Sequence, residues 1–526
     1  MSAGVETFPW RRLDARMLLV HPVLELMKFL PFLVGVFVLG SNSGNGWWQL
    51  IGLAIPVALG VLRFLTTRFR ITSSQVELQR GLLSRRVLTA RLDRVRAVEL
   101  TSSLIHRVLG LAKVEIGTAS GAKQDDDKFA LDGLRLEEAR KMRVALLHRA
   151  DDRSSSELVQ GGSELGGREQ GGRVQDGEVQ GDHASAEVTD GSLTEDVLLL
   201  DFDPRWVRYA PLTSSGNVIA AGVMAVLGQF SESIGDRVFH EVGGFSWITD
   251  RPLATIIPLA VLGGLALFLV LGAVFAVLGY LISNWGFTLA RDARRRTFHV
   301  RRGLLTTTEI SLERDRVRGL EVIEPLGLRM VGAGRLAAIV TGVSSSESGS
   351  SQLVPPAPRG VIDATGAAVL DLSEPLHLPL TRHGPAARRR RYTRALLGAS
   401  TLPVLAVVLA LTTPLGWWVV LPTLLAVPAG LLLAADRYRR LGHGLTEGYL
   451  VVRSGSLRGR RDVLQRSGII GWNLQQSWFQ RRAGLVTLVA TTAAGHQAYS
   501  AIDIPEAQAV VLADAAVPGL VTPFLA

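Results

Sequence analysis

Side chains that could catalyse a reaction or bind a metal are few in this sequence and poorly grouped. Three adjacent acids, Asp125–Asp127, cannot all face one ion from a single loop, and no further ligand spacing accompanies them. The ten histidines include no HExxH pair, and the serine-rich run Ser344–Ser351 has no nucleophile-elbow context. The absence of cysteine excludes disulfides, thiolate metal sites and a cysteine nucleophile. We therefore predict a protein that is not an enzyme and has no metal or cofactor.

Arginines form a more regular pattern, because they gather at three expected β-hairpins. The clusters are Arg80/Arg85/Arg86, Arg301/Arg302 and Arg453/Arg458/Arg460/Arg461. A leaflet of anionic lipid attracts such clusters with about 1 kcal/mol per charge near the surface. The clusters are therefore candidates for binding lipid headgroups or a partner, although solvated loops explain them equally well.

The elements that carry these arginines are repeated three times. Two glycines stand 29 residues apart in each copy, at Gly81 and Gly110, Gly303 and Gly332, and Gly455 and Gly484. An arginine precedes the second glycine by three positions each time, at Arg107, Arg329 and Arg481. Self-similarity of this kind indicates a duplication. The shared arginines could bond a carbonyl or carboxylate within the domain, or they could contact a ligand or headgroup.

Each copy has the pattern of β-structure followed by a helix. Apolar and polar residues alternate along Val95–Leu100 and Lys113–Thr118, which is typical of strands with one buried face. Leu136–His148 has apolar residues at helical spacing, and Pro505 and Glu506 begin a comparable helix. The second copy has only a weak closing helix in this interpretation, because it continues into a proline-rich stretch.

Long apolar runs precede every copy and predict an integral membrane protein. The mean hydropathy is +0.26, and about 20 apolar residues suffice for a helix to cross a bilayer. The six expected spans form three hairpins: Phe29–Gly40 and Trp47–Leu65, Leu212–Phe230 and Pro252–Ile282, and Ala395–Thr413 and Pro414–Ala434.

Charges at the ends of these runs predict the orientation. Arginines flank the outer ends of each pair, as in Arg388–Arg391, whereas the short loops Ser41–Gly46 and Thr412–Gly416 carry no positive charge. By the positive-inside rule, both termini and all large segments are cytoplasmic. Trp47, Trp247 and Trp417 then fall at the outer interface. Since topology explains the arginines, the net charge of +10 does not indicate nucleic-acid binding.

We therefore expect a membrane α + β protein with six transmembrane helices as three hairpins, each followed by a cytoplasmic antiparallel β domain. Residues 150–196 are acidic and rich in glycine, and we expect a disordered linker there. The predicted parts are a cytoplasmic N-terminus at 1–20, hairpins at 21–66, 205–284 and 392–436, and domains at 67–149, 285–382 and 440–518, with a flexible insertion at 344–360.

The order of motifs in each copy resembles the bacterial PH-like domain family (bPH2). The first copy has the full order: a hairpin with Arg-Gly, then Asp-Arg-Val, a polar pair, and Arg-x-x-Gly-Leu before a strand ending in Thr. The third copy has Ser454-Gly455 at the hairpin and Ile469 at the valine position. The polar pair is Ser102-Ser103, Glu324-Pro325 and Gln476-Ser477. Helical hairpins followed by such domains resemble the YdbT-like membrane proteins of bacteria. The resemblance implies a bent antiparallel sheet closed by a C-terminal helix, and it carries over no catalytic residues.

Two functions remain open from the sequence. The first is a non-enzymatic scaffold in the bacterial plasma membrane, whose three PH-like domains bind anionic lipid headgroups or a membrane or cytosolic protein at the inner leaflet. The alternative is a small transporter or export accessory subunit built on the six helices. The expected spans contain no ionisable residue in their cores, which disfavours transport of ions or protons.

Overall fold

The computed structural model describes most of the three copies and two of the helical hairpins. The described residues are 10–18, 20, 58, 61–62, 65–72, 75–80, 86–91, 95–118, 129–142, 197–213, 215–229, 253–292, 297–341, 350–413, 417 and 420–519. The predicted linker at 150–196 and nearly all of the first hairpin lie outside these residues. The chain divides into two compact units, Met1–Leu198 with Ala290–His299 and Thr308–Ser311, and Leu199–Leu289 with Val300–Thr307 and Leu312–Ala526.

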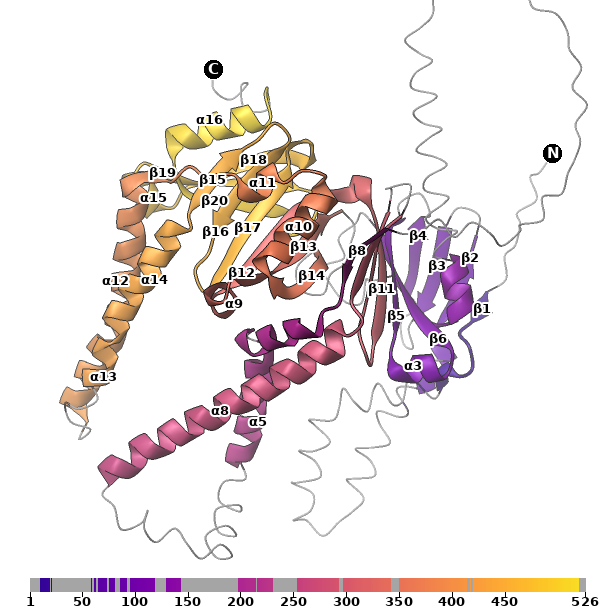
Figure 1. The fold of residues 1–526 in the computed structure, drawn as a ribbon, viewed down its shortest axis with the longest axis horizontal. Helices are drawn as coiled ribbons and strands as arrows, with labels where there is room; N and C mark the ends of the chain where they lie inside the picture. Colours follow the sequence, from indigo (N-terminus) through magenta and orange to yellow (C-terminus); the bar gives the residue numbers. More distant parts are fainter. Residues whose placement is uncertain are drawn as a thin grey trace, which may run out of the picture. The chain divides into compact units, whose positions relative to one another are not determined.

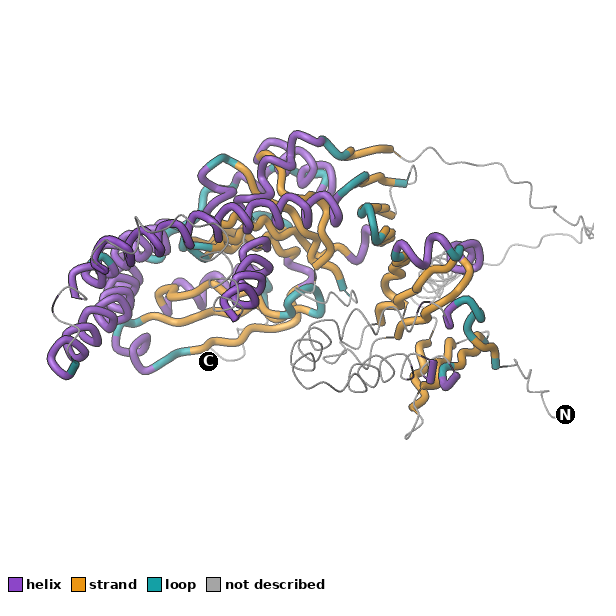
Figure 2. The backbone as a smooth tube through the Cα atoms, turned by 90° about the horizontal axis from the view of Figure 1, so that it is seen from below, coloured by secondary structure: helices purple, strands orange, loops and turns teal. Residues whose placement is uncertain are grey.

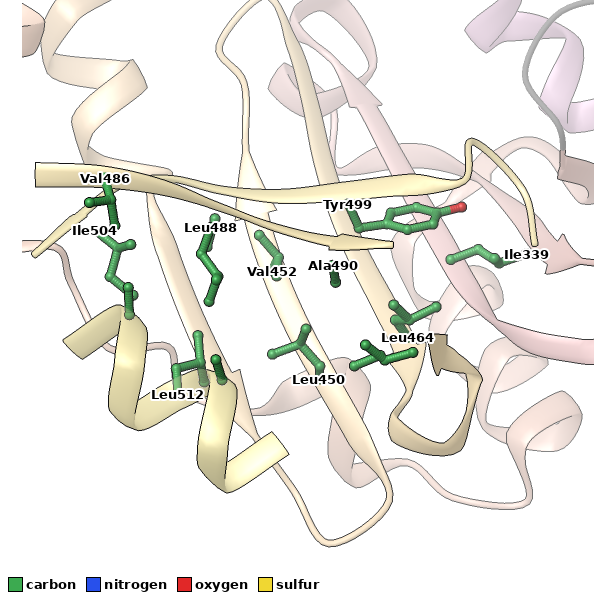
Figure 3. Close-up of a cluster of buried hydrophobic side chains, with 14 of the residues drawn as sticks. Ile339, Leu450, Val452, Leu464, Val486, Leu488, Ala490, Tyr499, Ile504 and Leu512 are labelled. Atoms are coloured by element: carbon green, nitrogen blue, oxygen red, sulfur yellow. The ribbon is translucent and has the colours of Figure 1, made fainter. Parts of the chain in front are cut away.

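The third copy shows the repeated unit most completely (Figure 1). Its elements are β15 (Gly442–Leu445), β16 (Tyr449–Ser454), β17 (Arg458–Gln465), β18 (Ile469–Gln475), α15 (Trp478–Arg482), β19 (Leu485–Thr492), β20 (Ala498–Pro505) and α16 (Glu506–Ala516). All its strand pairs are antiparallel. A core of apolar side chains fills the space between the strands and α16, and includes Leu450, Val452, Leu488 and Leu512 (Figure 3).

The second copy repeats this order of elements. It contains β9 (Thr288–Arg291), β10 (Thr297–Arg302), β11 (Thr307–Glu313), β12 (Val317–Pro325), α9 (Leu326–Met330), β13 (Ala333–Val340), β14 (Ser350–Pro358) and α10 (Arg359–Leu370). The expected flexible insertion at 344–360 is therefore wrong for its second half, which forms β14. This strand lies at the edge of its sheet, where prolines are tolerated because no outer neighbour needs their N–H groups.

The weak closing helix expected in the second copy is also wrong, because α10 runs for 12 residues. Its two glycines lower the intrinsic helix propensity, and tertiary packing compensates for this. Ile362 and Val369 are buried, and a Cβ at Gly366 would lie 2.8 Å from the Leu376 side chain. Helix propensity alone disfavours glycine at position 366, but the Leu376 side chain lies so close there that a larger residue would not fit without displacing it.

The first copy has the same order of elements in the residues that are described. They are β2 (Arg68–Ile71), β3 (Gln75–Arg80), β4 (Arg86–Arg91), β5 (Val95–Ser102), α3 (Leu104–Val108), β6 (Leu111–Thr118) and β7 (Phe129–Arg135). The short strand β1 (Arg11–Arg12) pairs with β2. Residues 136–142 are helical, which confirms the start of the predicted closing helix, and its later residues lie outside the described part.

Sheets in this protein extend across the boundaries between copies. The six-stranded sheet has the order β14-β13-β12-β17-β16-β15, so the second and third copies share it. In the register of its central pair, Glu321 lies opposite Asp462 and Val322 opposite Arg461. The seven-stranded sheet has the order β7-β6-β5-β11-β10-β9-β8, where β8 is Val197–Asp201. The remaining sheets are β1-β2-β3-β4 and β18-β19-β20.

Apolar helices precede the second and third copies. They are α5 (Ser215–Gln229), α8 (Leu253–Asn284), α12 (Gly384–Thr412), α13 (Val420–Leu424) and α14 (Ala426–Arg439). Three described stretches are long and apolar enough to cross a membrane: Val261–Asn284, Gly384–Thr412 and Val420–Arg439. Figure 2 shows the long helices as continuous purple tubes. The six-helix arrangement remains a prediction, because the first hairpin lies almost wholly outside the described residues.

Within the second hairpin, small residues allow two helices to approach closely. A Cβ at Gly216 of α5 would lie 2.1 Å from the carbonyl oxygen of Gly272 in α8, and one at Gly272 would lie 2.6 Å from Asn217 Oδ1. Such small-residue contacts are common between membrane helices, where van der Waals packing replaces the hydrophobic effect.

The hairpin glycine of the third copy provides a test of the repeated fold. Gly455 has φ +93°, and a Cβ there would lie 2.1 Å from the Arg458 carbonyl oxygen. We expect Gly455→Ala to lower the free energy of unfolding by roughly 1–3 kcal/mol, measured by denaturation of the full chain in detergent. Gly448→Ala is the matched control, since no atom lies within 4 Å of its added Cβ. Equal midpoints for the two variants would contradict the prediction.

Candidate functional site

The shared glycines make one structural turn in every copy. After the short helix, the φ angles are +70°, +65° and +61° at Gly110, Gly332 and Gly484. Their carbonyl oxygens accept hydrogen bonds of 3.0, 2.9 and 3.2 Å from the amides of Leu136, Arg359 and Glu506. Each turn is therefore bonded to the first residue of the closing helix. The hairpin glycines Gly303 and Gly455 also have positive φ, whereas Gly81 lies outside the described residues.

The three arginines before these glycines differ in their surroundings. Arg329 donates to Asp436 of α14 at 3.2 Å and to the Ser456 carbonyl at 3.3 Å, so it bonds a membrane hairpin and the third copy. Arg107 and Arg481 are exposed at the ends of α3 and α15. Of the two alternatives left open for these arginines, a bond within the same domain does not describe Arg329.

Two of the three hairpin clusters of arginines are described by their side-chain contacts. Arg302 donates to Gln352 Oε1 at 2.6 Å, and Gln352 donates to Asn284 of α8 at 3.2 Å, whereas Arg301 is exposed. Arg80 and Arg86 end neighbouring strands, but their side chains and all of Arg85 lie outside the described part.

In the third cluster, most of the guanidinium groups are directed inward. Arg461 donates to the carbonyl oxygens of Pro375 and Leu378 at 3.0 and 2.9 Å, and burial lowers its pKa to about 10. Arg453 is half-buried, and burial lowers its pKa as well. Arg458 alone in this cluster is exposed. The sequence pattern could not distinguish these roles, because the acceptors lie far away along the chain.

Two carboxyl groups and an arginine lie close together where the second and third copies share a sheet. The fully buried Glu321 faces the buried Asp462 across the β12–β17 pair, and Arg460 Nε lies 2.8 Å from Glu321 Oε1. His496 Nε2 lies 3.3 Å from Glu321 Oε2. Burial, and then the neighbouring Glu321 carboxylate, raise the pKa of Asp462 well above its usual value. This joint was missed at the level of sequence, because its residues belong to different copies.

A second buried ionic contact connects a membrane helix to the third copy. Asp503, at the end of β20, is fully buried and accepts hydrogen bonds from Arg390 of α12 and from Gln480 at 2.9 Å. Arg391 lies 2.8 Å from its other oxygen. The sequence analysis explained Arg388–Arg391 by membrane topology alone. Since α12 begins at Gly384, these arginines lie within the helix, and Arg390 and Arg391 also fix it to the domain through Asp503.

Two buried histidines lie beside this contact. His383 Nδ1 is 2.9 Å from the Ile502 carbonyl oxygen, and its Nε2 is 3.1 Å from His443 Nδ1. Burial is the main cause that lowers the pKa of both rings, to about 4 for His443. Both rings are therefore neutral near pH 7 and connect the start of α12, strand β15 and strand β20.

The short helix α15 presents aromatic side chains to solvent next to this contact. Trp478 and Phe479 are exposed and meet edge to face with ring centroids 5.0 Å apart. The Arg482 guanidinium stacks 5.0 Å from the Trp478 ring. Arg390 of α12 also reaches Ser477, which caps α15, at 3.3 Å. The adjacent aromatic pair followed by two arginines was a sequence signal that could have identified this surface.

Among the described residues, no group of three or more His, Asp or Glu is arranged to hold a metal ion. The acidic run Asp125–Asp127 lies outside these residues. The internal contacts described above stabilise the domain and its joints.

Comparison with known proteins identifies the repeated unit. The model of the family described as "Bacterial PH domain" matches residues 25–150, 242–369 and 394–514, which is most of the chain. This chain belongs to the bacterial PH domain family. The predicted resemblance is confirmed, and the three copies are bacterial PH domains.

One curated relative supports a place in the membrane for these PH domains. The UPF0699 transmembrane protein YdbT of Bacillus subtilis (strain 168) is 24% identical over 146 residues. The match covers 27% of this chain and 29% of that relative. No solved structure matches the chain. With the three apolar helices, these findings describe a membrane-associated protein with repeated PH domains.

The contact between α12 and the third PH domain can be tested at Asp503. Asn is isosteric and tolerates the positive φ of 58°, so Asp503→Asn removes the charge with little backbone strain. We expect a loss of about 3–5 kcal/mol of stability, because two arginines lose their buried carboxylate. Thermal unfolding of the full chain in detergent measures this loss. Glu447→Gln, at an exposed carboxylate, is the control, and a similar small change in both variants would disprove the role of Asp503.

The β12–β17 joint predicts a dependence of stability on pH. Because the folded pKa of Asp462 is raised above the usual 3.8, its stabilising contribution is complete below 3.8 and is lost as pH rises through the folded pKa. We expect Asp462→Asn to reduce the fall in unfolding temperature between pH 4 and higher pH. The groups that face Asp462 are Glu321 and Arg460, with His496 next to Glu321. An unchanged pH profile in the Asp462→Asn variant would contradict the prediction, because it would mean that the pKa of Asp462 does not differ between the folded and the unfolded protein.

Proposed function

We propose that this protein is a non-enzymatic scaffold of the bacterial plasma membrane that presents three PH domains at the inner leaflet to bind anionic lipid headgroups or a protein partner. The observation that carries the proposal is the buried contact of Asp503 with Arg390 and Arg391. Because this contact fixes the third PH domain to a helix that can cross the membrane, the domain is held at one height and orientation above the bilayer.

The height follows from the spacing along α12. Arg390 precedes the apolar part of the helix, which begins at Ala395, by five residues. At a rise of 1.5 Å per residue, Arg390 and the bonded Ser477 lie roughly 8 Å from the start of the hydrocarbon-spanning segment. This distance corresponds to the headgroup layer of a bilayer. The exposed rings of α15 therefore fall at a depth where aromatic side chains are enriched in membrane proteins.

Charge next to these rings fits the same location. Arg481 and Arg482 are exposed on α15, and the cationic ends of α12 and α14 lie on the same side of the hairpin. Each arginine near an anionic leaflet contributes about 1 kcal/mol of attraction. The positive-inside rule assigns this arginine-rich side, both termini and all three domains to the cytoplasm. Among the hairpin arginines, the exposed Arg301 and Arg458 remain candidates for headgroup or partner contact.

The described helices provide no specific support for the transporter alternative. Val261–Asn284 and the apolar parts of α12 and α14 contain no acidic or basic residue that could relay a proton or ion. We therefore do not propose transport.

Contact between α15 and the leaflet can be measured by fluorescence quenching. The chain has no cysteine, so Phe479→Cys provides a single site for a fluorescent probe on the full-length protein in liposomes. We expect spin-labelled phosphatidylglycerol to quench this probe, because Phe479 lies at headgroup depth. The control probe is attached at Val511→Cys, on the exposed face of α16. If the probe at position 479 is quenched no more strongly than the control probe at position 511, the proposed contact of α15 with the leaflet is wrong.

A further inference from the structure

The three PH domains are joined through their sheets, and this arrangement leaves one strand of the first domain and one strand of the last domain without a neighbour on one side. Between the second and third domains, β12 pairs with β17 in antiparallel register. In the seven-stranded sheet, β5 is the neighbour of β11. The fourth strand of a domain therefore takes the third strand of the domain that follows it. This rule accounts for both joints in the chain.

The rule identifies β18 and β4 as the strands without such a neighbour. Strand β18 is the fourth strand of the last domain, and β4 is the third strand of the first domain. Among the described strands, β18 pairs only with β19, and β4 only with β3. An unpaired edge presents a row of N–H and C=O groups that can accept another strand.

The two edges carry exposed apolar side chains. On β18, Ile470 and Leu474 are 66% and 45% exposed, and on β4 Val87 is 54% exposed. Proteins usually protect an edge with lysine, proline or a bulge against pairing with other chains, and large apolar side chains on an edge favour pairing. Strand β18 has a register shift between Ile469 and Gly471. Strand β12 has one at the equivalent place and still pairs with β17, so the shift does not prevent pairing.

Transferring the observed register brings these side chains together. In the β12–β17 pair, Val322 lies opposite Arg461. The repeat alignment makes Leu474 the equivalent of Val322 and Val87 the equivalent of Arg461. Two exposed apolar residues would thus face each other directly, where opposite side chains on neighbouring strands lie about 5 Å apart.

A glycine at the joint supports the same register. A Cβ at Gly319 of β12 would lie 2.0 Å from the Val463 carbonyl oxygen, so only glycine fits where β17 approaches. The equivalent residue of β18 is Gly471. The equivalent residue of β5 is Ala97, and β5 still neighbours β11, so glycine permits the closest approach of a neighbouring strand without being required at every joint. Strand β18 has this permissive residue, although none of the described strands lies beside it.

We propose that β18 of the third PH domain binds β4 of the first PH domain in a second copy of this protein, with Leu474 opposite Val87. The contact continues the rule that joins the domains within one chain, and main-chain hydrogen bonds extend one sheet across two molecules. Because the two surfaces differ, the contact is head-to-tail, and it either closes a ring or continues along the membrane. Lipid contact through α15 is not required for it.

The cysteine-free chain allows a direct test by disulfide crosslinking. Two full-length versions with different tags, one Val87→Cys and the other Leu474→Cys, are coexpressed, and isolated membranes are treated with a mild oxidant. We expect a two-tag disulfide product in several-fold higher yield than for the matched pair Val87→Cys and Val511→Cys. The expected separation of opposite strand residues falls within the range that a disulfide needs.

A charged edge variant separates a specific pair from random collision. Ile470 is exposed, so Ile470→Lys should leave the unfolding midpoint unchanged while reducing the two-tag product several-fold. Equal yields in the test and control pairs would overturn the proposal. A third version carries both Val87→Cys and Leu474→Cys in one chain. If it forms a disulfide only within that chain and the two-tag product is absent, the proposal is also overturned. Quenching of the probe at Phe479→Cys is measured in a chain that carries Ile470→Lys and no other cysteine. Loss of self-assembly is thereby distinguished from loss of membrane contact.

Discussion

The buried carboxylate of Asp503 is the constraint on which the arrangement of the third hairpin and its PH domain depends. A charge removed from water requires close partners, and here Arg390 and Arg391 of α12 supply them. Separation of the helix from the domain would leave a buried charge uncompensated. The helix therefore continues from its apolar segment into the domain as one support, and the neutral histidine pair packs against the same junction.

The three PH domains share their turns and differ in the residues around them. The glycine after the short helix has the same conformation and the same hydrogen bond to the closing helix in each domain. In contrast, Arg329 bonds to α14, whereas its equivalents Arg107 and Arg481 are exposed. Duplication has thus preserved the backbone of the fold, while side chains at equivalent positions connect each domain to its own surroundings.

Local and repeated features could be predicted from the sequence, whereas contacts between distant residues could not. Glycine spacing, strand alternation and apolar runs predicted a repeated β unit and membrane helices, and the resemblance to the bacterial PH-like domain family implied the PH fold. Helix α10 was expected to be weak because packing against Leu376, rather than propensity, stabilises a segment with two glycines. The inward-facing Arg460 and Arg461 were interpreted as surface charges, because their acceptors belong to another domain or to a segment more than 80 residues away.

The shared sheet also has a consequence for biosynthesis. Strand β12 leaves the ribosome well before its partner β17, because the two strands are far apart in the sequence. Arg318 and Gln465, which are hydrogen-bonded between them, lie 147 residues apart. At about 5–20 residues per second, translation of that interval takes roughly seven to thirty seconds. The third helical hairpin is synthesised within this time, because α12, α13 and α14 lie between β12 and β17 in the chain. Until then the second PH domain has an open strand edge, so the nascent chain passes through a stage in which a chaperone or a neighbouring nascent chain could bind it.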